Sequence, residues 1–263
     1  MKILFLGDIM GKPGRRAVRE LLPGLLESME IELVIANCEN AAAGFGVTRD
    51  IVEELFNCQI DVLTSGNHIW DKKEIDGFIE DYRNMIRPAN YPSGVRGFGS
   101  TIATGKSGVP VGVLNLIGRV FMKELDCPFR TAQREIALLK EKTNIIIVDI
   151  HAEATSEKQA IGWFLDGQVS AVLGTHTHVQ TADERVLTKG TAFITDAGMT
   201  GPFDSIIGNE KGGVIERFLT GIPNRFEVAR GDVFLQGAVI DVDAQTGLST
   251  GIERVNIRLD RNH

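Results

Sequence analysis

The chain has 263 residues, 43% of them hydrophobic and 24% charged, a balance typical of a soluble globular protein. A formal net charge of -7 disfavours a surface that coats long nucleic acid or a polybasic membrane contact. The three cysteines are widely spaced without a C-x-x-C pair, which disfavours a zinc ribbon or a disulfide framework and favours a reducing compartment. No apolar run approaches the ~20 residues of a membrane span. We therefore expect a cytoplasmic protein with no membrane partner and no long nucleic-acid partner.

The first part of the chain alternates between strand-like and helix-like segments. Apolar runs predict strands at 2–6, 33–36 and 61–64. Amphipathic patterns predict helices at 13–27, 48–56 and 72–82, the second of them capped by Thr48. Such alternation is typical of a largely parallel sheet with crossover helices.

The second part changes character. Segments 98–104 and 109–116, joined by a polar turn with two glycines, predict a hairpin. Helices are expected at 131–142 and at 156–165 with a cap, and strands at 144–150 and 169–173. After residue 185 the pieces look short and strand-like, as at 234–242 and 250–257, and no helix longer than one or two turns is expected after residue 166. We therefore expect one α/β domain over residues 1–263, with two mixed β-sheets flanked by helices.

Histidine is rare in this chain, and four of its five histidines fall in three short motifs. The fifth, His263, is the last residue and carries no signal. Each motif follows an apolar run, which places the imidazoles at strand ends, where α/β folds collect their ligands. The motifs are Gly66-Asn67-His68, Asp149-Ile150-His151 and Gly174-Thr175-His176-Thr177-His178.

Two carboxylates stand in the same context. Asp8 follows the first strand, but the glycines around it fit neither a dinucleotide-binding loop nor a P-loop. An acidic residue near a helix N-terminus is the alternative reading of Asp8. Glu39 ends an otherwise apolar strand, where a buried carboxylate needs either a cation or a hydrogen-bond network. Both readings stay open for each residue taken alone.

The His176-x-His178 pair carries the most weight. Side chains two residues apart on an extended segment point to the same face, so we expect these two imidazoles to converge. Taken singly, Asn67 could be a turn residue and His151 a structural histidine. Five strand-to-loop junctions with such side chains together indicate a metal site, and oxygen and imidazole ligands without thiolate suit iron, manganese or zinc.

In this order the motifs resemble the calcineurin-like metallophosphoesterase superfamily, whose fold is a four-layer αββα sandwich. The chain departs from most members at Met10, where a histidine is usual, and at Glu39, where an aspartate is usual. Both departures are shared with the YmdB-type bacterial branch of 2',3'-cyclic-nucleotide 2'-phosphodiesterases. Further stretches resemble that branch over essentially the whole chain: Asn40-Ala41-Ala42-Ala43-Gly44-Phe45-Gly46-Val47-Thr48, Gly66-Asn67-His68-Ile69-Trp70-Asp71, Arg87-Pro88-Ala89-Asn90-Tyr91-Pro92, and Thr195-Asp196-Ala197-Gly198-Met199-Thr200-Gly201-Pro202.

The resemblance implies a binuclear, metal-dependent phosphodiesterase. Its two divalent or trivalent transition-metal ions would be iron or manganese, with zinc as an alternative. Glu39 would bridge both ions, and a hydroxide held between them would attack phosphorus while His68 protonates the leaving oxygen. The other ligands would divide into Asp8, Asn40 and His178 on one ion and Asn67, His151 and His176 on the other.

Cyclic mononucleotides are the expected substrates, 2',3'-cyclic in the first place and 3',5'-cyclic as a further class. The alternatives are a phosphomonoesterase or nuclease on the same metal pair, and a nucleotide-sensing regulator with little turnover. Phe45 and Gly46 are candidate substrate contacts, with ordinary packing and an ordinary turn as the competing readings. For His68 the competing reading is an outer residue that orients a ligand. A homo-oligomer is left open.

Overall fold

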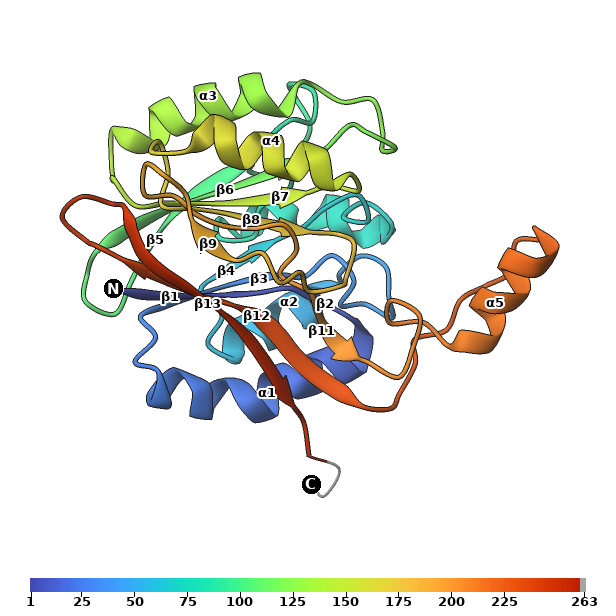
Figure 1. Cartoon of the computed structure of the whole chain (residues 1–263). Helices are drawn as coiled ribbons and strands as arrows, with labels where there is room; N and C mark the ends of the chain where they lie inside the picture. Colours follow the sequence, from blue (N-terminus) through green and yellow to red (C-terminus); the bar gives the residue numbers. More distant parts are fainter. Residues whose placement is uncertain (261–263) are drawn as a thin grey trace.

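The structure is a computed structural model that describes residues 1–260, so His263 lies outside the described residues. Two mixed sheets lie face to face between two layers of helices (Figure 1). The first sheet contains β1 (Lys2–Leu6), β2 (Asp8–Ile9), β3 (Leu33–Asn37), β4 (Val62–Thr64), β11 (Met199–Pro202), β12 (Val233–Val242) and β13 (Ser249–Arg258). The second contains β5 (Ser100–Thr104), β6 (Pro110–Ile117), β7 (Ile146–His151), β8 (Ala171–Thr175), β9 (Arg185–Val186) and β10 (Ala192–Ile194).

Parallel and antiparallel pairs occur in both sheets, which confirms the predicted mixed architecture. β1, β3 and β4 are parallel neighbours, and β1 also pairs antiparallel with β12. In the second sheet β6, β7, β8 and β10 run parallel, with β5 and β9 antiparallel at the edges. The predicted hairpin is the β5–β6 pair.

Helices cover the outer face of each sheet (Figure 1). α1 (Gly11–Ser28) and α2 (Arg49–Asn57) pack against the first sheet, and α3 (Pro128–Lys140) and α4 (Thr155–Leu165) against the second. Side chains alternate along β1, where Ile3 and Phe5 face the second sheet while Leu4 and Leu6 face the helices. Burial on both faces explains why these strands read as continuous apolar runs.

Two helix predictions are wrong. Segment 72–82 forms two 3₁₀ helices, η1 (Lys73–Gly77) and η2 (Ile79–Asp81), because Gly77 interrupts the segment and 3₁₀ geometry also brings residues three apart onto one face. After residue 166, α5 (Lys211–Thr220) is a ten-residue helix. Its sequence signal is weak because Gly212 and Gly213 lower helix propensity in the first turn.

The predicted helix caps are confirmed in position for α2 only, and neither helix has a side-chain capping hydrogen bond. Thr48 holds the N-cap position of α2, but its side chain makes no capping hydrogen bond. α4 begins one residue earlier than expected, with Ala154 at the N-cap. Both helices are held by burial of an apolar face instead.

α5 projects away from the rest of the molecule on an arm that leaves the first sheet after β11 (Figure 1). It buries only Val214, while Phe218 and Leu219 are 83% and 81% exposed. Within residues 1–260, no helix is both long and apolar enough to cross a bilayer.

Candidate metal centre

The candidate ligand residues come from five strand ends that meet between the two sheets. Parallel strands bring their carboxyl ends to the same edge, which is why residues distant in sequence become neighbours here. The seven residues lie on or just after β2, β3, β4, β7 and β8 and are Asp8, Glu39, Asn40, Asn67, His151, His176 and His178.

Three of these side chains converge on one ring nitrogen of a fourth. His151 Nε2 lies 3.0 Å from Glu39 Oε1, 3.0 Å from Asn67 Oδ1 and 3.0 Å from His176 Nδ1. On an ion with bonds of ~2.1 Å, two ligand atoms at right angles stand about 3.0 Å apart. The chemistry and spacing of this donor set therefore fit a metal ion, and Glu39, His151 and His176 also form a group able to hold one.

A hydrogen-bond chain orients His151 for this role. Thr175 Oγ1 donates its single proton to Asp149 Oδ1 at 2.7 Å, so it accepts from His151 Nδ1 at 2.9 Å. His151 Nε2 is thereby left to face the donor cluster. Asp149 is fully buried and also accepts from Thr64 Oγ1 at 2.6 Å and Asn37 Nδ2 at 3.1 Å. Such outer partners fix both the ring and the nitrogen that ligates.

The second group of candidate ligands adjoins the first. Asn40 Nδ2 lies 3.1 Å from His178 Nε2, 3.4 Å from Asp8 Oδ1 and 3.5 Å from Glu39 Oε1. A 180° rotation of the Asn40 side-chain amide would place its Oδ1, a possible metal ligand, where Nδ2 lies now. His178 Nδ1 donates to the carbonyl of Ile207 at 2.9 Å, which leaves Nε2 free to ligate. Glu39 thus touches both groups.

The two histidines of the His-x-His motif enter different groups, and the extended geometry expected for them is wrong. β8 ends at Thr175, and His176 and His178 adopt φ values of 95° and 63° in the bend that follows. Left-handed backbone at non-glycine residues is uncommon and costs energy. In this bend the two imidazoles have different partners, since His176 meets His151 while His178 meets Asn40.

Asp196 accounts for this bend. Its carboxylate accepts hydrogen bonds from Thr177 N at 3.1 Å and Thr177 Oγ1 at 2.6 Å, and from Lys158 Nζ at 2.8 Å. Both Lys158 and Asp196 are fully buried. A buried ion pair that also binds the residue between two histidines fixes the backbone from which both project.

The ligands of the first group lie so close to Gly66 that a residue with a side chain does not fit there. A Cβ at this position would lie 2.3 Å from His151 Nε2 and 2.4 Å from Glu39 Oε2. Any larger residue would occupy the space between the ligands, so the glycine of the Gly-Asn-His motif has a steric cause.

The buried charges perturb one another strongly. Burial raises the pKa of Asp8. Burial also opposes ionisation of Glu39, but the charge and hydrogen bond of His151 outweigh it and lower its pKa to about 2. The pKa of His151 rises in turn to about 9, because Glu39 outweighs the effect of burial. Burial, followed by the charge on His151, lowers the pKa of His176 to about 3, so this ring is neutral, the form that ligates metals.

His68 lies beside the centre, at the side where Phe45 packs. Its backbone N–H donates to Glu39 Oε2 at 3.0 Å, and its Nδ1 lies 2.8 Å from Asp71 Oδ2. The Phe45 ring meets the imidazole edge-on, with centroids 5.0 Å apart. Gly46 has φ 71°, and a Cβ there would lie 2.9 Å from the side chain of Lys72. Phe45 and Gly46 thus both belong to the loop that borders His68.

Several residues around the centre escaped sequence reasoning. Asp149 and Thr175 orient His151, Asp71 bonds His68, and the carboxylate of Glu153 lies 3.0 Å from His176 Nε2. Two signals were available: an aspartate inside the most apolar strand, and an aspartate three residues after His68. The position of Glu153 depends on tertiary structure and had no local signal.

Comparison with known proteins identifies relatives of the whole chain and of its fold. The chain is 51% identical over 260 residues to the 2',3'-cyclic-nucleotide 2'-phosphodiesterase of Bacillus subtilis, covering 99% of this chain and 98% of that protein. Its fold matches the crystal structure of a hypothetical protein from Thermus thermophilus with a TM-score of 0.92 at 41% identity, covering 98% and 99% of the two chains. A novel phosphatase of Mycoplasma pneumoniae matches with a TM-score of 0.92 at 34% identity, covering 98% and 93%.

A sequence model of one family covers nearly the whole chain. The model, described as YmdB-like protein, matches residues 4–255. Every candidate ligand and His68 fall within that range. Together with the Bacillus relative, this match shows that the chain belongs to the YmdB-like protein family.

Proposed function

We propose that the protein is a metal-dependent phosphodiesterase that hydrolyses 2',3'-cyclic nucleotides at the 2' ester bond and leaves a 3'-phosphate. The observation that carries this proposal is the convergence of Glu39, Asn67 and His176 on His151 Nε2, each at 3.0 Å. The substrate class is taken from the name of the Bacillus relative, which is half identical over almost the full length of both chains.

We infer that the centre holds two transition-metal ions, iron or manganese, with zinc as the alternative. Asn67, His151 and His176 would ligate one ion, and Asp8, Asn40 and His178 the other, with Glu39 between them. Glu39 supports this division because its Oε1 lies 3.0 Å from His151 Nε2 and 3.5 Å from Asn40 Nδ2. Cys38 is next to Glu39, but burial raises the pKa of its thiol and disfavours thiolate ligation.

When bound, such ions polarise phosphoryl oxygens and activate water, which is the usual chemistry of paired sites. The residues of the chain supply orientation and a proton. Asp71 holds His68 through Nδ1, so Nε2 is the nitrogen from which the ring can protonate the leaving 2' oxygen. Phe45 packs edge-on against this ring and, with Gly46, borders the space that we assign to the substrate.

Replacement of His68 tests this assignment. We expect His68→Ala to keep the metal content and to lower kcat about 10²–10⁴-fold, the usual effect of losing a general acid. The loss should be much smaller for a nitrophenyl phosphodiester, whose leaving group needs little protonation. Asp71→Asn serves as the matched variant, because it removes only the negative charge beside the ring and should cost less. Equal losses for good and poor leaving groups, or loss of metal, would refute the acid role.

The competing activities differ in their substrates. A panel of 2',3'-cyclic, 3',5'-cyclic and linear phosphodiesters, together with phosphomonoesters, separates a cyclic phosphodiesterase from a phosphomonoesterase or nuclease. We propose that 2',3'-cyclic nucleotides are the best of these and that long RNA and DNA are poor, in keeping with the net charge of -7. A regulator that only senses nucleotides would bind the cyclic substrate without turning it over.

The proposal also covers the domain organisation and the location of the protein. Contact of Glu39 from one sheet with His151 from the other supports a single domain built on both. The cysteines Cys38, Cys58 and Cys127 are all free thiols, which supports a reducing, cytoplasmic location.

We further propose that the protein self-associates through α5, where Phe218 and Leu219 are exposed to solvent in the single chain. A ten-residue helix is marginal in water by itself, and most soluble oligomers are assembled from copies of one chain. Sedimentation of the wild type should give an oligomer that Phe218→Ser dissociates. A wild type that stays monomeric at high concentration would contradict this.

A further inference from the structure

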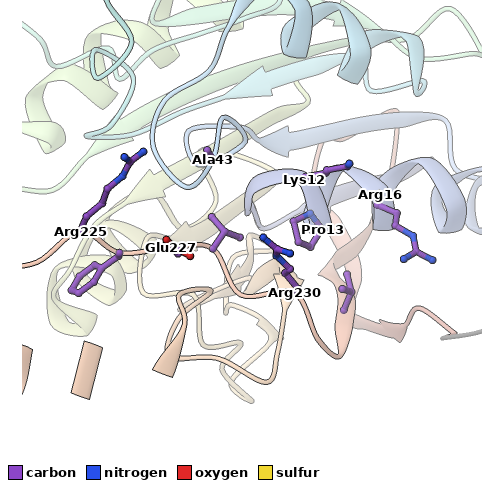
Figure 2. A pocket seen from close by; sticks show the side chains of 10 residues that line it. Lys12, Pro13, Arg16, Ala43, Arg225, Glu227 and Arg230 are labelled. Atoms are coloured by element: carbon purple, nitrogen blue, oxygen red, sulfur yellow. The ribbon is translucent and has the colours of Figure 1, made fainter. Parts of the chain in front are cut away.

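A groove with a volume of about 760 Å³ lies between α1 and the segment before β12 (Figure 2). One wall is the start of α1, the other is the segment that returns from α5 toward β12, and Ala43 lies at the end between them. We call it the basic groove after the charged and aromatic side chains that line it: Lys12, Arg16, Arg225, Phe226, Glu227 and Arg230.

The cations of the basic groove have little internal compensation. Lys12, Arg225 and Arg230 make no hydrogen bond or ion pair through their side chains with any residue from 1 to 260. Arg16 is held by Glu20 on its own helix, and among residues 1–260 Glu227 is the one acidic side chain in the lining. Because the whole chain carries -7, a local excess of positive charge around a cavity stands out and would concentrate an anionic ligand.

The groove is joined to the metal centre through the loop that follows β3. Ala43 comes three residues after Asn40, so their Cα atoms are at most ~11 Å apart. On the other wall, Gly11 N donates to the carbonyl of Asn40 at 2.9 Å, and Lys12 is the next residue. Gly44 packs against Val228 of the returning segment, where a Cβ would lie 3.2 Å from the valine side chain. The loop from Asn40 to Gly44 therefore borders both the metal centre and the basic groove.

The chemistry of the proposed substrate indicates what would continue there. A 2',3'-cyclic phosphate requires ribose, and it also ends longer RNA fragments, where it forms when a 2' hydroxyl attacks the neighbouring phosphodiester. Cationic side chains beside an aromatic ring are the usual platform for single-stranded nucleic acid, and Phe226 provides that ring. The Glu227 carboxylate can accept a hydrogen bond from a ribose 2' hydroxyl. A volume of about 760 Å³ is that of a small-ligand pocket and suits a tail of about one or two nucleotides.

We propose that the basic groove binds the 5' portion of a short oligoribonucleotide whose terminal 2',3'-cyclic phosphate lies at the metal centre. This rests on the proposed function and extends its substrate from mononucleotides to RNA fragments of a few residues. In the reaction, water oxygen bonds to phosphorus, the bond from phosphorus to O2' breaks, and O2' takes a proton. The fragment then carries a 3'-phosphate and a free 2' hydroxyl. The reaction that supplies such substrates is therefore RNA cleavage by 2' hydroxyl attack.

The test compares kcat/KM for a 2',3'-cyclic mononucleotide with that for a tetraribonucleotide ending in the same group. The wild type should prefer the tetranucleotide. Arg225→Gln/Arg230→Gln should lower the ratio of the two constants about tenfold, since each exposed cation–phosphate contact contributes about two- to fivefold. Arg225→Lys/Arg230→Lys should restore most of it. Arg130→Gln/Lys140→Gln is the matched control, because it removes the same charge from α3 on the outer face of the second sheet.

Each result decides for or against the groove. A wild type without preference for the tetranucleotide, or a groove variant whose ratio equals that of the control, overturns the proposal. Equal losses on both substrates also overturn it, because they would report a general effect on the protein. Both pairs of positions are exposed in the structure, so the melting temperature should not change.

The proposed function can fail separately from the groove. If the wild type hydrolyses neither substrate, the phosphodiesterase assignment is wrong. Fluorescence anisotropy of a labelled tetraribonucleotide still tests the groove, because binding by the wild type should weaken about tenfold in the Arg225→Gln/Arg230→Gln variant. Unchanged binding there, or binding of mononucleotides alone, would refute an RNA tail in the groove.

Discussion

Thr175 offers the most specific test of how the structure prepares the metal centre. Its hydroxyl donates to Asp149 at 2.7 Å and accepts from His151 Nδ1 at 2.9 Å, and the side chain is fully buried. Thr175→Val keeps the shape and removes both hydrogen bonds. His151 then loses the acceptor that orients its ring and directs Nε2 toward Glu39 and Asn67.

The expected size of the effect follows from those two bonds. One bond goes to the Asp149 carboxylate and the other comes from His151, which is protonated in the metal-free protein. A buried hydrogen bond to a charged group contributes ~1.5–3 kcal/mol, so Thr175→Val should cost roughly 3–6 kcal/mol of stability in the metal-free protein. Loss of an outer partner of a ligating histidine usually weakens metal binding about 10–100-fold. Both effects should appear together in this variant.

Thr64→Val is the matched control. Thr64 donates to the same Asp149 carboxylate at 2.6 Å and is equally buried. No hydrogen bond joins its side chain to His151 among the described residues. Urea unfolding should show a smaller destabilisation in Thr64→Val, which loses one short hydrogen bond to Asp149 instead of two bonds. Competitive Mn²⁺ titration should show the large affinity loss in Thr175→Val alone. Equal metal affinities in the two variants would refute the orienting role of Thr175.

Two further predictions concern the same centre. Gly66→Ala would place a Cβ within 2.4 Å of both His151 and Glu39, so we expect loss of metal and a destabilisation of ~1–3 kcal/mol. Elemental analysis and urea unfolding measure these two effects. A variant that binds metal normally would contradict the steric role of Gly66. Because the pKa of His151 is about 9 in the metal-free protein, this ring is protonated at pH 7, and an ion must displace that proton. Calorimetry in buffers of different ionisation enthalpy should therefore detect about one proton released from this ring, and affinity should fall as pH falls; pH-independent binding would show that His151 is not a ligand.

The sheets and the convergence of ligands were predictable from sequence because both depend on strong local patterns. Apolar runs locate the strands of each sheet; His151 is the last residue of β7, and Glu39 follows the end of β3 by two residues. Parallel pairing then brings those ends to one edge without further information. For this reason the mixed two-sheet architecture was predicted correctly.

The features that sequence did not predict depend on tertiary contacts. The bend at His176 and His178 is imposed by Asp196, which is 19 residues from Thr177 in sequence. No helical or strand pattern in the sequence predicts this contact. α5 has two adjacent glycines in its first turn and buries one side chain, so the sequence pattern for a helix is weak there. The basic groove combines α1 with a segment more than 200 residues later, and only the fold places Lys12 near Arg225.

The most direct test of the central claim is a metal titration of the chelator-stripped protein, followed by turnover of a 2',3'-cyclic nucleotide. Activity should be absent without metal and should rise with added Fe²⁺ or Mn²⁺ to a plateau at two ions per chain, with a 3'-phosphate as the product. Glu39→Gln should fail to reach that plateau because the carboxylate that contacts both ligand groups has lost its charge. Full turnover by the stripped protein, or no turnover with two ions bound, would contradict a binuclear phosphodiesterase.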